Sequence, residues 1–295
     1  MTNFESLILG IIEGLTEFLP VSSTAHLKFA NPLLGVQHSA FTDMYEVVIQ
    51  LAAILAVVLV YYKKFFDLKK MHFYIKLIIA VIPALVFGAL LKKHIDHVLN
   101  NITIIAVVMI AGGILLLFID RLFTRSVTDK EENISNKQAF VVGCFQVLSI
   151  LFPGLSRSAA TIVGGLSQKM TRRLAAEFSF FLAVPTMIAA SAKAFYDACK
   201  DSFLTANNIS EEQAKSMKIS MMHDVFGSAN LHTLFNHDNT MAFIIGCVVS
   251  FIVALMAVKF FIGYVQKHSF RAFGWYRIVL GTVMLALIFS HVISN

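Results

Sequence analysis

Six long apolar runs constrain this chain more than any other feature of its sequence. They cover approximately residues 41–62, 71–91, 101–119, 175–196, 241–263 and 272–292. A hydrocarbon core of roughly 30 Å is crossed by about 20 apolar residues in a helix. Only 14% of the residues are charged, whereas soluble proteins carry about 25%. We therefore expect an all-α polytopic membrane protein with six transmembrane helices, and not a soluble or disulfide-rich domain.

Two further apolar runs are too short to cross the membrane. Residues 7–19 end at Pro20 and are followed by VSSTAH, and residues 140–152 end at Pro153 and are followed by GLSRSAAT. Runs of this length form helices of about 20 Å. A short helix, a polar break and a second short helix predict a re-entrant hairpin. Irregular backbone at membrane depth is tolerated only inside protein or against a water-filled cavity.

Lysine and arginine are unevenly divided between the two faces that these elements define. If each hairpin returns to the face it entered, one face holds the segments 63–70, 120–137, 167–173 and 264–272, and the other holds 1–40, 92–100, 197–240 and the C-terminus. The first face carries 13 Lys and Arg residues and the second carries 6. Because cytoplasmic loops are enriched in Lys and Arg, we expect the first face to be cytoplasmic and segment 197–240 to be a polar extracytoplasmic loop. The net charge of +6 therefore does not indicate a nucleic-acid partner.

The two hairpins also suggest an internal repeat. A shift of 133 residues aligns Gly10 with Gly143, Leu15 with Leu148, Pro20 with Pro153, Ser23 with Ser156, and Glu13 with Gln146. Each half has one hairpin and three spans, and the odd number of spans inverts the second half. We expect a single membrane domain over residues 1–295 with inverted-topology repeats at about 1–120 and 137–295. Such repeats place their site near the midplane, between them.

Two carboxylates precede the first break. Glu13 and Glu17 lie four residues apart, so a helix places them on one face. Like charges so close favour a shared proton or a bound cation. Two carboxylates together with substrate phosphate oxygens are a typical Mg²⁺ arrangement, with Ca²⁺ as the alternative divalent cation. The competing interpretation is a buried pair of acids satisfied by hydroxyl groups.

The two breaks carry the other candidate site residues. The second break contains Ser156, Arg157, Ser158 and Thr161. A guanidinium, hydroxyl donors and a helix N-terminus together are suited to binding an oxyanion such as phosphate. Alternatively, Arg157 caps a helix or lies at the cytoplasmic edge among Lys169, Arg172 and Arg173. The first break contains Ser22, Ser23, Thr24 and His26, and we favour a functional role for this histidine over a structural one.

Glu46 and Glu177 lie near the starts of two predicted spans. They are interpreted either as supports for the hairpins or as acids that stabilise a helix start through the helix dipole. The residues alone leave both interpretations open.

The sequence resembles the undecaprenyl-diphosphatase family, also called the bacitracin-resistance family. The resemblance rests on EGLTEFLPVSSTAH at 13–26, PGLSRSAAT at 153–161, EFSFFLAVP at 177–185 and SFRAFGWYRIVLG at 269–281. It implies hydrolysis of undecaprenyl diphosphate, a polyprenyl diphosphate lipid, to undecaprenyl phosphate and inorganic phosphate. This reaction recycles the lipid carrier of peptidoglycan and cell-wall synthesis and confers bacitracin resistance.

The resemblance carries further expectations. It implies a metal-dependent site in the bacterial cytoplasmic (inner) membrane, surrounded by membrane lipids and opening to the extracytoplasmic side, with a homodimer left open. By position it implicates Glu13, Glu17, Ser23 and His26 in the first motif, and Ser156, Arg157, Ser158 and Thr161 in the second. The family has Gly where this chain has Ala25, and a positive φ there would strain alanine by roughly 1–2 kcal/mol.

The expected mechanism has two versions. Glu13 and Glu17 hold a divalent cation on the diphosphate, and Arg157 and the hydroxyls of Ser22, Thr24, Ser156, Ser158 and Thr161 bind phosphate oxygens. Either Ser23 attacks with His26 as general base, which we favour, or His26 attacks or activates water while Ser23 positions the substrate. The rival function is a lipid-phosphate flippase or ion-coupled anion transporter, since inverted repeats with broken helices are also transporter architecture.

Overall fold

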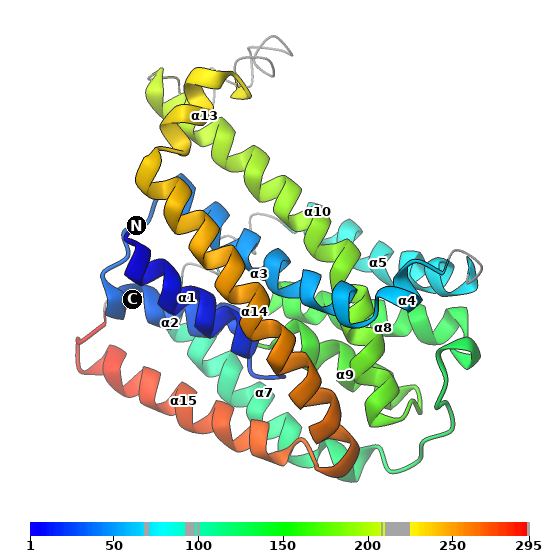
Figure 1. Cartoon of the computed structure of the whole chain (residues 1–295). Helices are drawn as coiled ribbons and strands as arrows, with labels where there is room; N and C mark the ends of the chain where they lie inside the picture. The colour runs from blue at the N-terminus through cyan, green and yellow to red at the C-terminus, as the bar shows by residue number, and fades with distance from the viewer. Residues whose placement is uncertain (68–70, 92–97, 99–100, 208, 210–224, 294–295) are drawn as a thin grey trace.

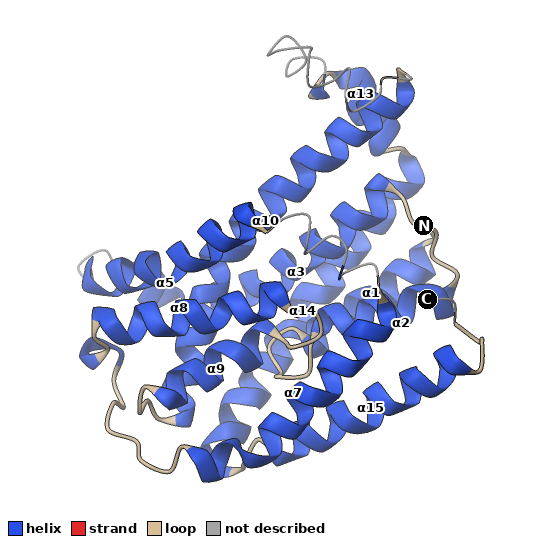
Figure 2. Cartoon of the chain, turned by 180° about the vertical axis from the view of Figure 1, so that it is seen from behind, coloured by secondary structure: helices blue, strands red, loops and turns tan. Residues whose placement is uncertain are grey.

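The computed structural model describes residues 1–67, 71–91, 98, 101–207, 209 and 225–293. In these residues the chain is built from helices joined by loops, with one isolated bridge between Thr128 and Met170 (Figure 2). Six helices have the length and composition of membrane spans: α3 (Ala40–Val60), α5 (Met71–Leu90), α7 (Ile102–Leu122), α10 (Arg172–Ala206), α14 (His237–Lys267) and α15 (Arg271–Phe289). The prediction of a multi-pass helical membrane protein with six spans is confirmed.

Shorter helices lie between the spans. They are α1 (Asn3–Thr16), α2 (Ser23–Leu34), α4 (Tyr62–Phe65), η1 (Glu131–Asn133), α8 (Asn136–Leu151), α9 (Arg157–Ser167) and α13 (Ser228–Leu234). Capping boxes start α1 and α8: Thr2 pairs with Glu5, and Ser135 pairs with Gln138. In each box a hydroxyl and the third helical residue satisfy two free N–H groups reciprocally.

A serine with positive φ starts the helix after each break. Ser22 has φ 72° and is the N-cap of α2, and Ser156 has φ 75° and is the N-cap of α9. Each hydroxyl accepts a hydrogen bond from the backbone N–H three residues later. Non-glycine residues rarely adopt positive φ. Ala25 lies within α2 and is not among the positive-φ residues, so the strain anticipated there is carried by Ser22 instead.

The helices pack in pairs that join distant parts of the chain. α1 packs against α14, α5 against α8, α7 against α15, and α3 against both α10 and α14 (Figure 1). The α5–α8 contact is so close that a Cβ on Gly143 would lie 2.2 Å from the carbonyl oxygen of Ala80. The largest core cluster gathers buried aromatic rings, including those of Phe18, Phe180 and Phe261. These contacts hold the two breaks inside the bundle.

The polar segment 197–240, expected to be an extracytoplasmic loop, is partly helical. α10 continues to Ala206 and is 35 residues long, and α14 begins at His237. Polar residues extend these helices because helical hydrogen bonds satisfy the backbone whether or not the side chains are apolar. Asn230 of α13 donates to the carbonyl oxygens of Cys199 and Val225 and ties α13 to the end of α10.

Several segments used in the charge count lie outside the described residues. These are residues 68–70, 92–97, 99–100, 208 and 210–224. The expected placement of the loops at 63–70, 92–100 and 197–240 is therefore described only in part.

Candidate active site

A pocket of about 720 Å³ lies where the two breaks meet α3 and α10. The first break contributes Glu17, Ser22, Ser23 and Thr24, and the second contributes Pro153, Gly154, Ser156 and Arg157. The structure thus brings together residues that lie far apart in the chain, as the two polar clusters of the sequence predict.

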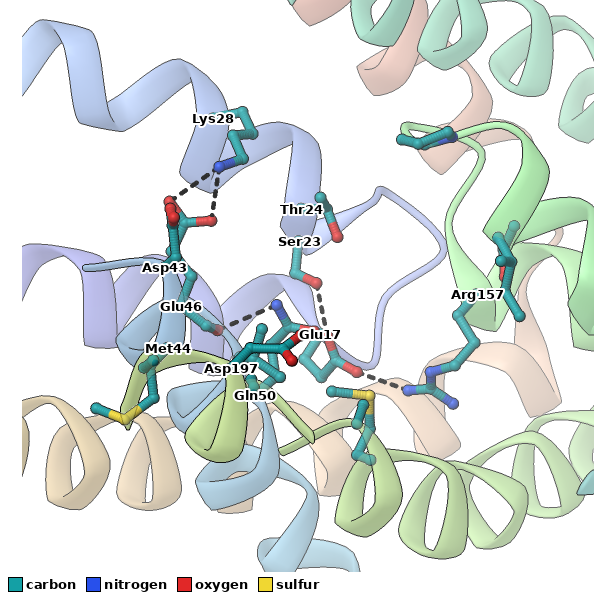
Figure 3. Close-up of a pocket in the computed structure, with 18 of the residues that line it drawn as sticks. Glu17, Ser23, Thr24, Lys28, Asp43, Met44, Glu46, Gln50, Arg157 and Asp197 are labelled. Atoms are coloured by element: carbon teal, nitrogen blue, oxygen red, sulfur yellow. Dashed lines mark hydrogen bonds and ion pairs between the residues drawn. The ribbon is translucent and has the colours of Figure 1, made fainter. Parts of the chain in front are cut away.

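Glu17 is the pocket residue that bonds side chains of both breaks. Ser23 Oγ donates to Glu17 Oε2 over 2.6 Å, and Arg157 Nη2 donates to Glu17 Oε1 over the same distance (Figure 3). Arg157 Nη1 also donates to the carbonyl oxygen of Ser179 on α10, 3.3 Å away. The guanidinium is therefore fixed by two elements, and the Ser23 hydroxyl faces a carboxylate that can accept its proton. Arg157 is the first residue of α9, and its side chain is largely buried.

Glu13 lies one turn before Glu17 and is fully buried. Both of its carboxylate oxygens are buried and lack a hydrogen-bond partner in the described part of the protein. A buried anion without a partner is costly, so this carboxyl group needs a proton or a cation. The hydroxyl partners of the competing interpretation are not found at Glu13. Two carboxylates one turn apart are a donor set that a hard divalent cation can use, although Glu13, unlike Glu17, is not among the residues that line the pocket.

Ser158 and Thr161 do not line the pocket, which differs from their predicted substrate-binding role. Ser158 Oγ lies 3.0 Å from Ser156 Oγ and donates to the carbonyl oxygen of Leu19 in the first break, also at 3.0 Å. Thr161 is completely buried, and its hydroxyl bonds Ser179 Oγ at 2.6 Å. Both side chains lie on the buried face of α9. Ser158 therefore links the second break to the first, and Thr161 links α9 to α10.

His26 also lies apart from the pocket and from the Ser23 hydroxyl. Its Nδ1 lies 2.7 Å from the Ser22 carbonyl oxygen, and its Nε2 lies 2.8 Å from the hydroxyl of Tyr276 on α15. A carbonyl only accepts, so Nδ1 carries a hydrogen and the neutral ring accepts from Tyr276. Both ring nitrogens are thus engaged elsewhere. The expected Ser23–His26 pair is not formed, and Glu17 is the base within reach of Ser23.

Arg277 is a buried residue in contact with both breaks that the sequence analysis did not single out. It is fully buried, and its guanidinium donates to backbone carbonyl oxygens of both breaks. Nη1 reaches Pro20 at 3.1 Å and Leu155 at 2.8 Å, and Nη2 reaches Gly154 at 2.8 Å. Nε donates to Met109 of α7. The available signal was an arginine inside the last apolar run, because ionisable groups at membrane depth are functional by default.

The sequence of this chain is similar to a known protein family over most of its length. The family described as "Bacitracin resistance protein BacA" matches residues 6–283. The chain belongs to the BacA family. It is 44% identical over 289 residues to an undecaprenyl-diphosphatase of Flavobacterium psychrophilum, covering 98% of this chain and 97% of that protein. It is 40% identical over 308 residues to an undecaprenyl-diphosphatase of Porphyromonas gingivalis, covering 99% of each.

Glu46 of this BacA chain is a pocket residue and not a helix-start acid. It lies in the second turn of α3, where its carboxylate pairs with Lys28 at 3.0 Å and accepts from Asn31 Nδ2 at 2.5 Å. Both partners belong to α2, so Glu46 links α3 to the helix that follows the first break. This agrees with one of its two sequence interpretations, but the sequence analysis had not singled out Lys28.

Glu177 lies at a second, smaller pocket of about 270 Å³. Its carboxylate pairs with Arg173 at 2.8 Å and with Lys64 at 3.4 Å, and Lys64 also pairs with Glu131. Burial and the nearby Glu177 charge raise the pKa of the Tyr61 hydroxyl above its ordinary value. This cluster joins α10, α4 and η1 by ion pairs.

Proposed function

We propose that this chain hydrolyses undecaprenyl diphosphate to undecaprenyl phosphate and inorganic phosphate. Membership of the BacA family supports the substrate, and the pocket supplies the chemistry. The observation that carries the proposal is the chain of contacts from Ser23 through Glu17 to Arg157. It combines a nucleophile, a base and a phosphate-binding cation. In the cell this activity would recycle the lipid carrier for cell-wall synthesis and confer bacitracin resistance.

The reaction proceeds in two steps. Ser23 Oγ attacks the terminal phosphorus and its proton passes to Glu17 Oε2, while the bond to the bridging oxygen breaks and undecaprenyl phosphate leaves. Water then attacks the phosphorus of the phosphoserine, and its oxygen and protons pass to the phosphate. The bond to Ser23 Oγ breaks as Glu17 returns the proton to Ser23 Oγ, and inorganic phosphate is released. Arg157 binds the equatorial oxygens, where its charge stabilises the transferring group. A direct attack by water positioned by Ser23 is the alternative.

A divalent cation belongs to this proposal. Glu13 and Glu17 would hold it, because the Glu13 oxygens are buried without hydrogen-bond partners. Bound there, Mg²⁺ or Ca²⁺ would neutralise charge on the diphosphate. Ser23 attacks and Arg157 orients the phosphoryl group, while Glu17 accepts the proton of Ser23 at Oε2 and would also share in holding the cation.

The two breaks are proposed to be the turns of re-entrant hairpins in inverted repeats. Support comes from equivalent features in the two halves: capping boxes start α1 and α8, and positive-φ serines start α2 and α9. Helix pairing is also consistent with a two-fold exchange of the halves, since α1 packs on α14 as α8 packs on α5, while α3 packs on α10 and α7 on α15.

The pocket is proposed to open to the extracytoplasmic side of the cytoplasmic membrane. Its lining includes the first turns of α3, at Ala40 and Asp43, and the last turns of α10, at Asp197, Lys200 and Asp201. These helix ends belong to the face with fewer Lys and Arg residues. A site there would receive a lipid substrate from the surrounding bilayer and release phosphate into water.

The test measures phosphate release from undecaprenyl diphosphate by the purified full chain in detergent, with and without a chelator. We expect wild-type turnover, loss on Ser23→Ala, and full activity in the matched control Ser167→Ala, whose hydroxyl bonds the nearby Gly164 and Gln168, outside the pocket. Label from terminally labelled substrate should appear on Ser23 in a rapid quench. Label on histidine would overturn the serine mechanism, and lipid transfer without phosphate release would support the transporter instead.

A further inference from the structure

A second cation, Lys28, lines the same pocket as Arg157. Its side chain is 22% exposed, and its Nζ lies 3.0 Å from Glu46 Oε2 and 3.3 Å from Glu46 Oε1. Two of the cations that line the pocket are each paired with a buried carboxylate: Arg157 with Glu17, and Lys28 with Glu46 (Figure 3). The mechanism uses only the first of these pairs.

Lys28 is placed to reach a ligand in the pocket. It belongs to α2, and it shares a helix face with Thr24, because residues four apart on a helix are neighbours. Both residues line the pocket. Four residues advance a helix by about 6 Å, and the lysine ammonium is carried on a flexible four-carbon chain. A group held beside Ser23 and Thr24 can therefore also contact Lys28.

Glu46 does not depend on Lys28 alone. Asn31 Nδ2 donates to Glu46 Oε1 over 2.5 Å, so the carboxylate keeps a donor when the ammonium turns to another anion. Without that donor, the exchange would leave a buried charge unpaired and would be costly. Lysine suits such an exchange, since its ammonium is a point charge with three rotatable donors.

We infer that Lys28 is a specificity-determining residue whose ammonium binds one phosphate group of a prenyl diphosphate while Arg157 and Ser23 hold the other. The inference rests on the proposed hydrolysis of such a lipid. A prenyl monophosphate has only one phosphate group. That group binds beside Arg157 and Ser23 and does not reach Lys28. Lys28 therefore favours the diphosphate substrate over the monophosphate product.

The test compares Lys28→Met with wild type in steady-state kinetics on undecaprenyl diphosphate, with undecaprenyl phosphate as the inhibitor. We expect KM to rise about tenfold, the order expected for a lost hydrogen bond to a charged group. The value of kcat should stay nearly constant, because the contact is made equally in the ground and transition states. The inhibition constant of undecaprenyl phosphate should be unchanged. Lys267→Met, at an exposed lysine in the last turn of α14, is the matched control.

A second variant separates binding from a purely structural tie between α2 and α3. Glu46→Gln weakens the hold on Lys28, so we expect KM to fall, opposite to Lys28→Met. If the pair were only a tie, both variants would raise KM and the inhibition constant together and lower the melting temperature, which would overturn the inference. Wild-type protein without phosphatase activity would instead refute the proposed function. An active wild type with unchanged KM in Lys28→Met would refute only the role of Lys28.

Discussion

Glu17 Oε1 and Arg157 Nη2 lie 2.6 Å apart, although 140 residues separate them in the chain. Both side chains are largely buried. Arg157→Met should lower kcat/KM by at least about 10²-fold through lost charge stabilisation, and should destabilise the protein by about 3 kcal/mol, because Glu17 is left as an unpaired buried charge. The double variant Glu17→Gln/Arg157→Met should recover stability but not activity. Equal instability of the single and double variants would contradict this account.

Arg277 binds carbonyl oxygens of both breaks, so its loss should loosen both together. Arg277→Met should cost about 3 kcal/mol of stability, since four buried carbonyl groups lose a charged donor. Activity should fall in parallel because Ser23 and Arg157 are no longer aligned. Thermal unfolding in detergent and phosphate release measure the two effects. Arg271→Met, at the exposed start of α15, should change neither.

The positive φ of Ser22 and Ser156 predicts an unusual preference for glycine at both N-caps. Alanine there loses the cap, which costs about 1 kcal/mol, and is also strained by about 1 kcal/mol. Glycine avoids the strain. The stability gap between the Gly and Ala variants should therefore be larger than at Ser135, an N-cap with φ −80°. Equal gaps at all three positions would show that these backbones relax.

Gly143 permits the close contact between α8 and α5. Its added Cβ would lie 2.2 Å from the Ala80 carbonyl oxygen, so Gly143→Ala should cost about 1–3 kcal/mol. Gly263 of α14 has no neighbour within 4 Å of such a Cβ. Gly263→Ala should therefore stabilise the protein by up to about 1 kcal/mol through helix propensity. Chemical denaturation in mixed micelles measures both, and a stabilised Gly143→Ala would contradict the packing.

Glu13 should govern metal binding rather than folding. Glu13→Gln removes a buried carboxyl charge while keeping its shape, so the melting temperature should stay constant or rise. The affinity for Mg²⁺, measured by titration calorimetry, should fall strongly, and the phosphatase activity should be lost. Exposed Glu132→Gln is the control. Wild-type Mg²⁺ affinity in Glu13→Gln would exclude this carboxylate as a ligand.

Local patterns were enough to predict the six spans, the two breaks and the approach of Glu17 to Arg157. Run length and the change from apolar to polar residues at Pro20 and Pro153 mark the two breaks, whereas Pro32, Pro83 and Pro185 lie inside helices. Two polar clusters inside a membrane must contact each other or water. The orientation of His26 was not predictable, because the rotation of α2 about its axis depends on Tyr276, 250 residues away. Lys28 was overlooked because its partner, a carboxylate on α3, leaves no local sequence pattern. Arg277 does stand out as an arginine inside an apolar run, although it was not singled out, and its backbone carbonyl partners could not be predicted from the sequence.

Arg277 has a consequence for biosynthesis. Pro20 and Gly154 emerge from the ribosome long before Arg277, which belongs to the last span. Until that span enters the bilayer, the carbonyl groups at both breaks lack their shared donor. The nascent chain should therefore be inactive until α15 has been synthesised. A protein truncated before α15 should insert into the membrane but should not turn over substrate.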